Sequence, residues 1–200
     1  TVAYTYDNSG ALASVTDSAT GRTTTYYYDF TGRLMRYVES GSGYDHSVGY
    51  VYDNLNNLTA LVEAINGTAR TTNYTYDADR RVSSISTNGI CENYTYDSYG
   101  RVYQKITKNG NTTVLTETYT YKTSASGKPT NQVATIRSTS AGWDVIYYYS
   151  YDSNGNITYF GNDSQSNTYG YDSANQLIRE NDQLAGVTWT YTYDDAGNLR

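Results

Sequence analysis

The chain alternates between two kinds of short segment, each with its own pattern of hydrophobic and polar positions. In one kind, two tyrosines two residues apart precede an aspartate, as in Tyr4-Thr5-Tyr6-Asp7. Residues at i and i+2 of a strand project from the same face, so this segment predicts a strand that carries a tyrosine pair. In the other kind, aliphatic residues stand three apart, as at Leu12 and Val15. That spacing breaks strict alternation and predicts a β-bulge or a strong twist early in the strand.

Aspartate and glycine mark the turn between the two segments. The unit Tyr-x-Tyr-Asp, two residues, Gly or Asn, a polar residue and an aliphatic recurs about every 20 to 25 residues. Its aspartates are Asp7, Asp29, Asp53, Asp77, Asp97, Asp152, Asp172 and Asp194. An aspartate at the first position of a turn accepts a backbone N–H two residues on, and the later glycine supplies a positive φ. We therefore expect positive φ at Gly10, Gly32, Gly100, Gly155 and Gly197, and a distorted or different turn at Arg80.

The far end of each hairpin carries a second turn signal. Asn66-Gly67, Asn88-Gly89 and Asn109-Gly110 are dipeptides typical of two-residue hairpin turns. The sequence thus predicts an all-β fold, an antiparallel meander with two strands per repeat and essentially no helix. A repeat of this length is typical of stacked supersecondary units.

One stretch departs from the repeat. Lys122 follows Tyr121 where an aspartate is expected, and the next aliphatic residue arrives late, at Val133. The Ser-, Gly- and Pro-containing residues between them predict a loop insertion near 122–132 that protrudes from the sheet. No other boundary is evident, so we expect residues 1–200 to form a single array of about nine repeats. Both ends cut into a repeat, which indicates a fragment of a larger protein.

Tyrosine dominates the packing residues, with 26 copies against 2 Phe and 2 Trp. The second tyrosine of each pair is expected on one sheet face, largely buried against neighbouring repeats. These residues are Tyr6, Tyr28, Tyr52, Tyr76, Tyr96, Tyr151, Tyr171 and Tyr193.

The charge pattern argues against several classes of partner. The formal net charge is −6, and the 14 basic residues are spread along the chain. Nucleic acids and anionic membrane surfaces attract clustered Lys and Arg, so neither partner is expected. No apolar run reaches the roughly 18 residues of a membrane span, and the first residues show no signal peptide.

No set of residues in the sequence predicts catalysis, a metal or a cofactor. His46 is the only histidine and is interpreted as a solvated turn residue, and Cys91 as a half-buried strand thiol. The aspartates recur once per repeat, so they should lie in a row instead of converging on one ion. We therefore predict a protein that is not an enzyme.

Two functions remain open at this stage. A structural scaffold explains every regular feature through the fold alone and ranks first. A carbohydrate-binding or adhesion module is the alternative, because exposed aromatic rings and Asn, Asp and Thr side chains suit sugar stacking and hydrogen bonding. The aromatic residues outside the tyrosine pairs are the glycan-binding candidates: Trp143, Trp189, Tyr99, Tyr103 and Tyr159.

The Tyr-Asp-x-x-Gly-Arg/Asn-Leu pattern over the whole chain resembles the YD repeats of bacterial rearrangement-hotspot (Rhs) proteins, which have relatives among toxin-complex subunits and teneurins. The resemblance implies an extended, curved or spiralling sheet that forms part of a hollow shell. It implies secretion or cell-surface display in a bacterium, and as partners the rest of the same polypeptide and an encapsulated C-terminal toxin. The Asp-Pro-x-Gly cleavage region of the family is absent here, so self-cleavage and cargo identity do not transfer.

Overall fold

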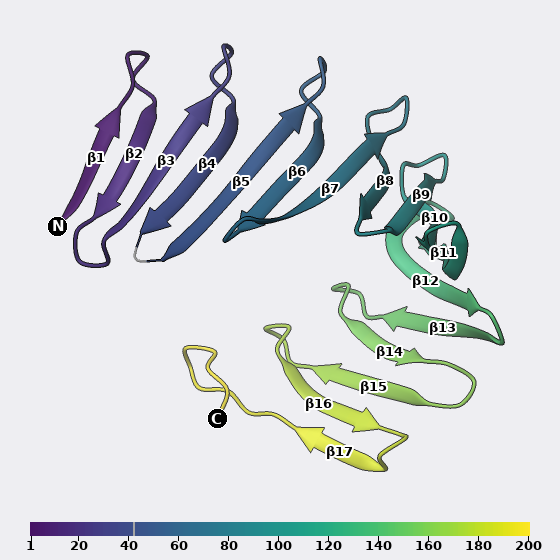
Figure 1. The fold of residues 1–200 in the computed structure, drawn as a ribbon. Helices are drawn as coiled ribbons and strands as arrows, with labels where there is room; N and C mark the ends of the chain where they lie inside the picture. The colour runs from purple at the N-terminus through teal and green to yellow at the C-terminus, as the bar shows by residue number, and fades with distance from the viewer. Residues whose placement is uncertain (42) are drawn as a thin grey trace. The chain divides into compact units, whose positions relative to one another are not determined.

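The computed structural model describes residues 1–41 and 43–200, and these residues form 17 strands and no helix (Figure 1). The chain divides into two compact units, Thr1–Asn93 and Tyr94–Arg200. In each unit, the described pairings are antiparallel and join strands that follow one another along the chain. The predicted all-β antiparallel meander is therefore confirmed.

The strands of the first unit are β1 (Val2–Tyr6), β2 (Leu12–Asp17), β3 (Arg22–Tyr28), β4 (Leu34–Gly41), β5 (Tyr44–Tyr52), β6 (Leu58–Ile65), β7 (Thr68–Tyr76) and β8 (Val82–Thr87). Strand β9 (Ile90–Tyr96) runs through the boundary between the units. The strands of the second unit are β10 (Val102–Asn109), β11 (Thr112–Thr123), β12 (Pro129–Ser140), β13 (Trp143–Tyr151), β14 (Ile157–Gly161), β15 (Ser166–Tyr171), β16 (Leu177–Asp182) and β17 (Val187–Thr190).

A β-bulge follows the turn in seven of the described hairpins, as the spacing of three predicts. In the first hairpin Tyr6 lies opposite Leu12, while Thr5 lies opposite Ser14, so Ala13 is the extra residue. The same register shift occurs in the hairpins β3–β4, β5–β6, β7–β8, β11–β12, β13–β14 and β15–β16. The bulge brings both aliphatics opposite the tyrosine pair, as with Leu58 opposite Tyr52 and Leu61 opposite Tyr50.

The turn residues adopt the predicted backbone conformation. All five glycines predicted to have positive φ do so, with values between 77° at Gly100 and 90° at Gly155. The prediction for Arg80 was wrong: its φ is 62°, and its N–H donates to the Asp77 carbonyl at 3.0 Å, as Gly32 does to Asp29. The hydrogen bonds made by the aspartate therefore impose the turn even on a residue that pays a steric cost for positive φ.

The turns at the opposite end of the strands form at the predicted Asn-Gly dipeptides, and one of them is displaced by one residue. Asn66 (φ 47°) and Gly67 (φ 82°) form a two-residue turn, as do Asn88 (φ 49°) and Gly89 (φ 80°). Positive φ at both positions is the type I′ geometry that suits the twist of a hairpin. At the third signal Asn109 belongs to β10 and pairs with Thr112, so Gly110 and the residue after it form the turn.

The loop predicted near 122–132 is mostly strand. Strands β11 and β12 extend to Thr123 and from Pro129, leaving a turn over 124–128. Ser124 takes the place of aspartate there: its N–H donates to the Lys128 carbonyl, its carbonyl accepts from Gly127, and its Oγ accepts from the Lys128 N–H at 3.1 Å. A second register shift, between Tyr121 and Thr123, absorbs the displacement of the turn.

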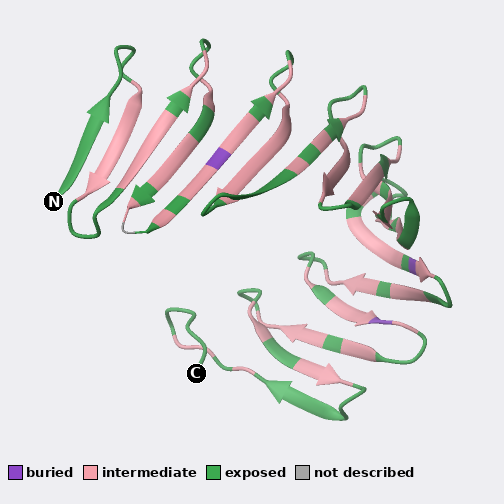
Figure 2. Cartoon of the chain, in the orientation of Figure 1, coloured by how far each residue is buried: buried purple, intermediate pink, exposed green. Residues whose placement is uncertain are grey.

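Burial is much lower than the tyrosine ladder predicts (Figure 2). Within the described residues, Val48 is the one buried hydrophobic residue, and no side chain is fully buried. The ladder tyrosines are half-buried, and Tyr6 is 65% exposed. Described contacts between elements join consecutive strands only, so no second layer covers either face of the sheet in a unit. The expectation of largely buried tyrosines was therefore wrong in degree.

Candidate functional site

The repeated aspartate is the centre of a compact hydrogen-bonded turn. In the second copy, Asp29 Oδ1 accepts the N–H groups of Thr31 and Arg33 at 2.8 and 3.0 Å. The Asp29 N–H donates to the Arg33 carbonyl, and the Asp29 carbonyl accepts from Gly32. The same pattern forms around Asp53, Asp77, Asp97, Asp152, Asp172 and Asp194. The predicted hydrogen bond from the N–H two residues after the aspartate to its carboxylate is confirmed. The second hydrogen bond to the carboxylate, from the N–H four residues after the aspartate, was not predicted.

The polar residue four positions after aspartate completes the turn. Its side chain binds the second carboxylate oxygen: Arg33 Nε lies 2.6 Å from Asp29 Oδ2, and Asn57 Nδ2 lies 2.9 Å from Asp53 Oδ2. The guanidinium groups of Arg33 and Arg101 also stack on a tyrosine of the next hairpin. Arg33 Cζ lies 4.7 Å from the centre of the Tyr52 ring, and Arg101 Cζ lies 4.2 Å from that of Tyr121. These distances are within the range of a cation–π interaction.

In six repeats a tyrosine hydroxyl forms a hydrogen bond to the repeat before it. Tyr52 Oη donates to the Leu34 carbonyl at 3.2 Å, and Tyr76 Oη donates to the Leu58 carbonyl at 2.7 Å. Equivalent bonds join Tyr28 to Leu12, Tyr121 to Val102, Tyr171 to Ile157 and Tyr193 to Leu177. The acceptor is always the first aliphatic after the turn. The second tyrosine of the pair is therefore a hydrogen-bonding link between repeats as well as a packing residue.

The turn bonds hold the aspartates ionised. The pKa of Asp77 is lowered, chiefly by the hydrogen bond from the Arg81 side chain, and that of Asp53 chiefly by the bond from Asn57. Lowered pKa values occur at Asp7, Asp29, Asp53, Asp77, Asp97, Asp152 and Asp194. A carboxyl whose folded pKa lies below its unfolded value stabilises the fold above the unfolded pKa, and this stabilisation is lost as the pH falls through the folded pKa.

We therefore expect the thermal stability of the chain to fall below about pH 4, where unfolded aspartates become protonated. Circular dichroism melts between pH 7 and pH 2 measure this fall. In the variant Asp77→Asn, hydrogen exchange of the β7 and β8 amides should lose its acid dependence. Asp195→Asn, at an exposed turn position, is the control and should retain it. An acid-independent melting temperature in the parent chain would contradict the role given to the carboxylates.

His46 lies in β5, so its interpretation as a turn residue was wrong. Its ring is half-buried, 5.7 Å from the ring centre of Tyr37 and 6.1 Å from that of Tyr44. The alternation of β5 places it on the tyrosine face, and the even spacing of Tyr44, His46 and Tyr50 is the sequence signal for that position. Cys91 is a half-buried thiol in β9, as predicted.

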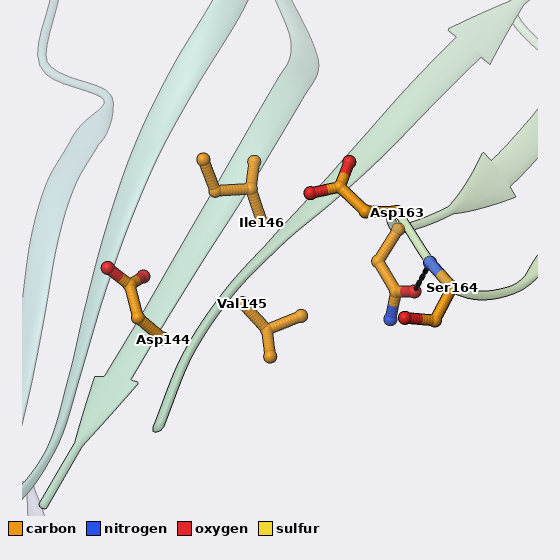
Figure 3. Close-up of a pocket in the computed structure, with 6 residues that line it drawn as sticks. Asp144, Val145, Ile146, Asp163 and Ser164 are labelled. Atoms are coloured by element: carbon orange, nitrogen blue, oxygen red, sulfur yellow. Dashed lines mark hydrogen bonds between the residues drawn. The ribbon is translucent and has the colours of Figure 1, made fainter. Parts of the chain in front are cut away.

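A shallow hollow of about 300 Å³ lies between the start of β13 and the loop after β14 (Figure 3). Its lining includes the carboxylates of Asp144 and Asp163, and Asn162 accepts the Ser164 N–H at 2.8 Å. The Arg137 guanidinium pairs with Asp144 and lowers the pKa of that carboxyl. Of the two aspartates in this hollow, Asp144 is therefore neutralised by an ion pair with arginine.

The five glycan candidates do not form one site. Trp143 begins β13 and Trp189 lies in β17, so four strand spacings, roughly 19 Å, separate their strands. Tyr103 lies in β10 and Tyr159 in β14, while the Tyr99 ring contacts Arg101 in a turn. Trp143, Trp189, Tyr99 and Tyr103 are exposed, and Tyr159 is half-buried. Exposure suits a ligand contact, but the spacing makes them separate surface positions.

Residues 1–41 and 43–200 contain neither a metal-binding cluster nor a membrane-spanning helix. No group of three or more His, Cys, Asp or Glu side chains is placed to hold a metal ion. No helix there has the length and apolar character needed to cross a membrane.

The chain is similar to several solved structures. Over 99% of its length it aligns with two crystal structures of TcdB2–TccC3, at 16% identity with a TM-score of 0.47 and at 17% identity with a TM-score of 0.44. It spans only 15% of those chains. A porin-like protein from Bacteroides uniformis aligns over 90% of this chain and 86% of its own, with 13% identity and a TM-score of 0.42. No curated protein sequence matches the chain.

A family model gives the sequence-level match. Residues 168–200 match the RHS repeat, a segment that contains the turns at Asp172 and Asp194 and the Tyr193–Leu177 link. The same turn and the same tyrosine link recur in the earlier copies. Residues 168–200 therefore carry an RHS repeat, and the earlier copies share its turn and its tyrosine link.

Proposed function

We propose that this chain is a non-enzymatic structural scaffold, a wall segment of a secreted or surface-attached YD-repeat shell that encloses or displays a toxin or effector. One observation carries the proposal. The same internal contacts recur along the chain: the aspartate binds the backbone of its own turn, and in six repeats the tyrosine donates to a carbonyl of the repeat before it. Residues used in this way extend and stiffen a sheet.

The arrangement of reactive groups supports a role without catalysis or a cofactor. Catalysis needs convergent groups within hydrogen-bond reach of one another. Here each aspartate is surrounded by its own turn, and successive turns repeat the same set along the sheet. The partners of such a segment are the neighbouring parts of the same YD-repeat polypeptide and, in this proposal, an enclosed C-terminal polypeptide.

Protease protection in the natural protein that contains this chain tests the enclosure. We expect the polypeptide on the C-terminal side to resist trypsin in the parent protein and to be degraded when Tyr76→Ala breaks the link to Leu58. Tyr27→Ala is the matched control, because Tyr27 is 49% exposed and lies between the paired tyrosines on the opposite face. Equal digestion of parent and Tyr76→Ala proteins would contradict enclosure, and electron microscopy would show whether a shell is present.

Carbohydrate binding is a second candidate, favoured by one specific hollow. Tyr147 and Phe160 stack in parallel, with ring centres 5.6 Å apart and an interplanar angle of 9°. They line a hollow of about 200 Å³ with the polar residues Asn162, Gln165, Asn167 and Asp182. An aromatic floor with amide and carboxylate groups at its rim suits a sugar ring.

A glycan array separates the two candidate functions. Specific binding that is lost in Phe160→Leu, Trp143→Ala or Trp189→Ala would favour the carbohydrate-binding function and locate it. If the unsubstituted chain binds no glycan on the array, the carbohydrate-binding function is refuted and the scaffold function stands.

A further inference from the structure

The first repeat lacks a side chain that the later repeats use to fill a defined space. Four residues after the turn aspartate, most copies have Arg or Asn, whose side chain binds Asp Oδ2. The first copy has Ala11 at this position. Within the described residues, the hydrogen bonds to the Asp7 carboxylate come from Ser9 and Ala11 and all use Oδ1. Asp7 Oδ2 is therefore open to another donor.

A hollow occupies the corresponding place. It has a volume of about 560 Å³, many times the roughly 30 Å³ of a water molecule. Its lining includes Asp7, Ala11 and Tyr28. Tyr28 donates to the Leu12 carbonyl as Tyr52 does to the Leu34 carbonyl, so its ring lies beside Ala11 as the Tyr52 ring lies beside Arg33. In the second repeat the guanidinium of Arg33 occupies this space.

The chain itself thus shows which group the space accepts. Arg33 and Arg101 each make an ion pair with the turn aspartate and a cation–π contact with the tyrosine of the next hairpin. Asp7 and Tyr28 present the same two partners with the cation absent. The Asp7 pKa is lowered, chiefly by the hydrogen bond from Ser9, so the carboxylate is charged at neutral pH.

The rim of the hollow favours a polypeptide over a free ion. Phe30 stands at the turn tip and is 100% exposed, and Tyr27 is 49% exposed. Both line the hollow. Other turns have Asn, Ser, Ala or Asp at the position of Phe30, as at Asn54, Ala78 and Ser98. Exposed aromatic side chains beside a cation site offer apolar contact to residues that flank a bound arginine.

We propose that the hollow formed by Asp7, Ala11, Tyr28 and Phe30 binds an arginine side chain of a partner polypeptide, with the guanidinium in the place that Arg33 and Arg101 fill in later repeats.

Titration of the 200-residue chain with a Gly/Ser peptide that contains one arginine tests the site. Tyrosine side-chain NMR signals report binding, with assignment from Tyr28→Phe. We expect the Tyr28 signals to shift progressively as the peptide is added, with the weak affinity that one exposed ion pair and one cation–π contact provide. A matched peptide with neutral citrulline in place of arginine should bind at least about tenfold more weakly. Equal binding of the two peptides would overturn the proposal.

Three variants locate the contact. Ala11→Arg supplies the missing side chain from within, so it should abolish peptide binding and raise the melting temperature by a few degrees. Asp7→Asn removes the charge but keeps an oxygen acceptor for the turn, and should weaken binding at least about fivefold. Arg33→Ala should create a second site, reported by Tyr52. Undiminished binding by Ala11→Arg would show that the peptide binds elsewhere, and overturns the assignment.

A further comparison tests the polypeptide partner. Phe30→Ser, which introduces the residue found at the equivalent position 98, should weaken binding of the peptide more than it weakens binding of the guanidinium ion. If the guanidinium ion alone binds as tightly as the peptide, the site is one for small cations and the polypeptide partner is refuted.

Discussion

Tyr76→Ala is expected to destabilise the hairpin β7–β8 and its junction with β6 by about 2–3 kcal/mol. Truncation of a fully buried aromatic costs about 3–5 kcal/mol, and the Tyr76 ring is half-buried. The hydrogen bond to the Leu58 carbonyl at 2.7 Å adds about 1 kcal/mol. Because each repeat contacts its neighbours only, the loss should be local. Native-state hydrogen exchange should show β6 and β8 amides exchanging about 100-fold faster.

Two substitutions separate the components of this effect. Tyr76→Phe removes the hydroxyl alone and should cost about 1 kcal/mol. Tyr27→Ala deletes the same atoms from a 49% exposed position on the other face of the sheet. It should change the hydrogen-exchange rates of the neighbouring backbone amides little. If Tyr27→Ala were as damaging as Tyr76→Ala, the tyrosine pair would have no special role in joining repeats.

Gly41→Ala is expected to cost about 3 kcal/mol or more. A Cβ at Gly41 would lie 2.3 Å from the Gly21 carbonyl oxygen and 3.0 Å from Arg22 Cα. Both contacts are with backbone, which cannot rotate away. The φ of 149° adds strain, since few residues other than glycine adopt it. Urea denaturation followed by circular dichroism measures the change.

Gly43→Ala is the matched control, two residues away. Gly43 has a φ of 80° but no atom within 4 Å of its would-be Cβ. It should therefore cost only about 1 kcal/mol, the strain of positive φ without the clash. Similar costs at the two glycines would show that backbone strain alone, and not the approach of β4 to the turn at Gly21, sets the requirement for glycine.

The fold could be predicted from the sequence wherever a local pattern determines it. Aspartate followed by glycine fixes a turn within five residues, and a spacing of three between aliphatics implies a bulge. The turn and the bulge each depend only on residues that are close together in the sequence. The prediction failed at Arg80 because residue preference was weighed above the hydrogen bonds that Asp77 imposes. It failed near residue 124 because serine was not recognised as a substitute for aspartate.

Features that depend on register or on layers were not predictable in the same way. The bond from Tyr52 to Leu34 joins residues 18 apart, and nothing local to either indicates the other. Half-burial of the tyrosines depends on whether a second layer covers the sheet, which composition does not reveal. The glycan candidates were chosen for residue type, and their separation over β10 to β17 follows from strand order. The hollow at Ala11 did have a signal, a small apolar residue at a position that holds Arg, Asn or Gln in the other aspartate turns.

The paired strands also restrict the lengths that a repeat can have. The intervals from Asp7 to Asp29, Asp29 to Asp53 and Asp77 to Asp97 are 22, 24 and 20 residues, all even. Lengthening a hairpin by one residue in each strand adds two residues and returns the next tyrosine pair to the same face. The interval from Asp97 to Ser124 is odd, 27 residues, and there the hairpin β10–β11 carries a register shift of one residue between Thr107 and Lys108. Repeats can therefore be duplicated, deleted or exchanged in even lengths at no cost in register, whereas an odd change requires a new bulge to correct it.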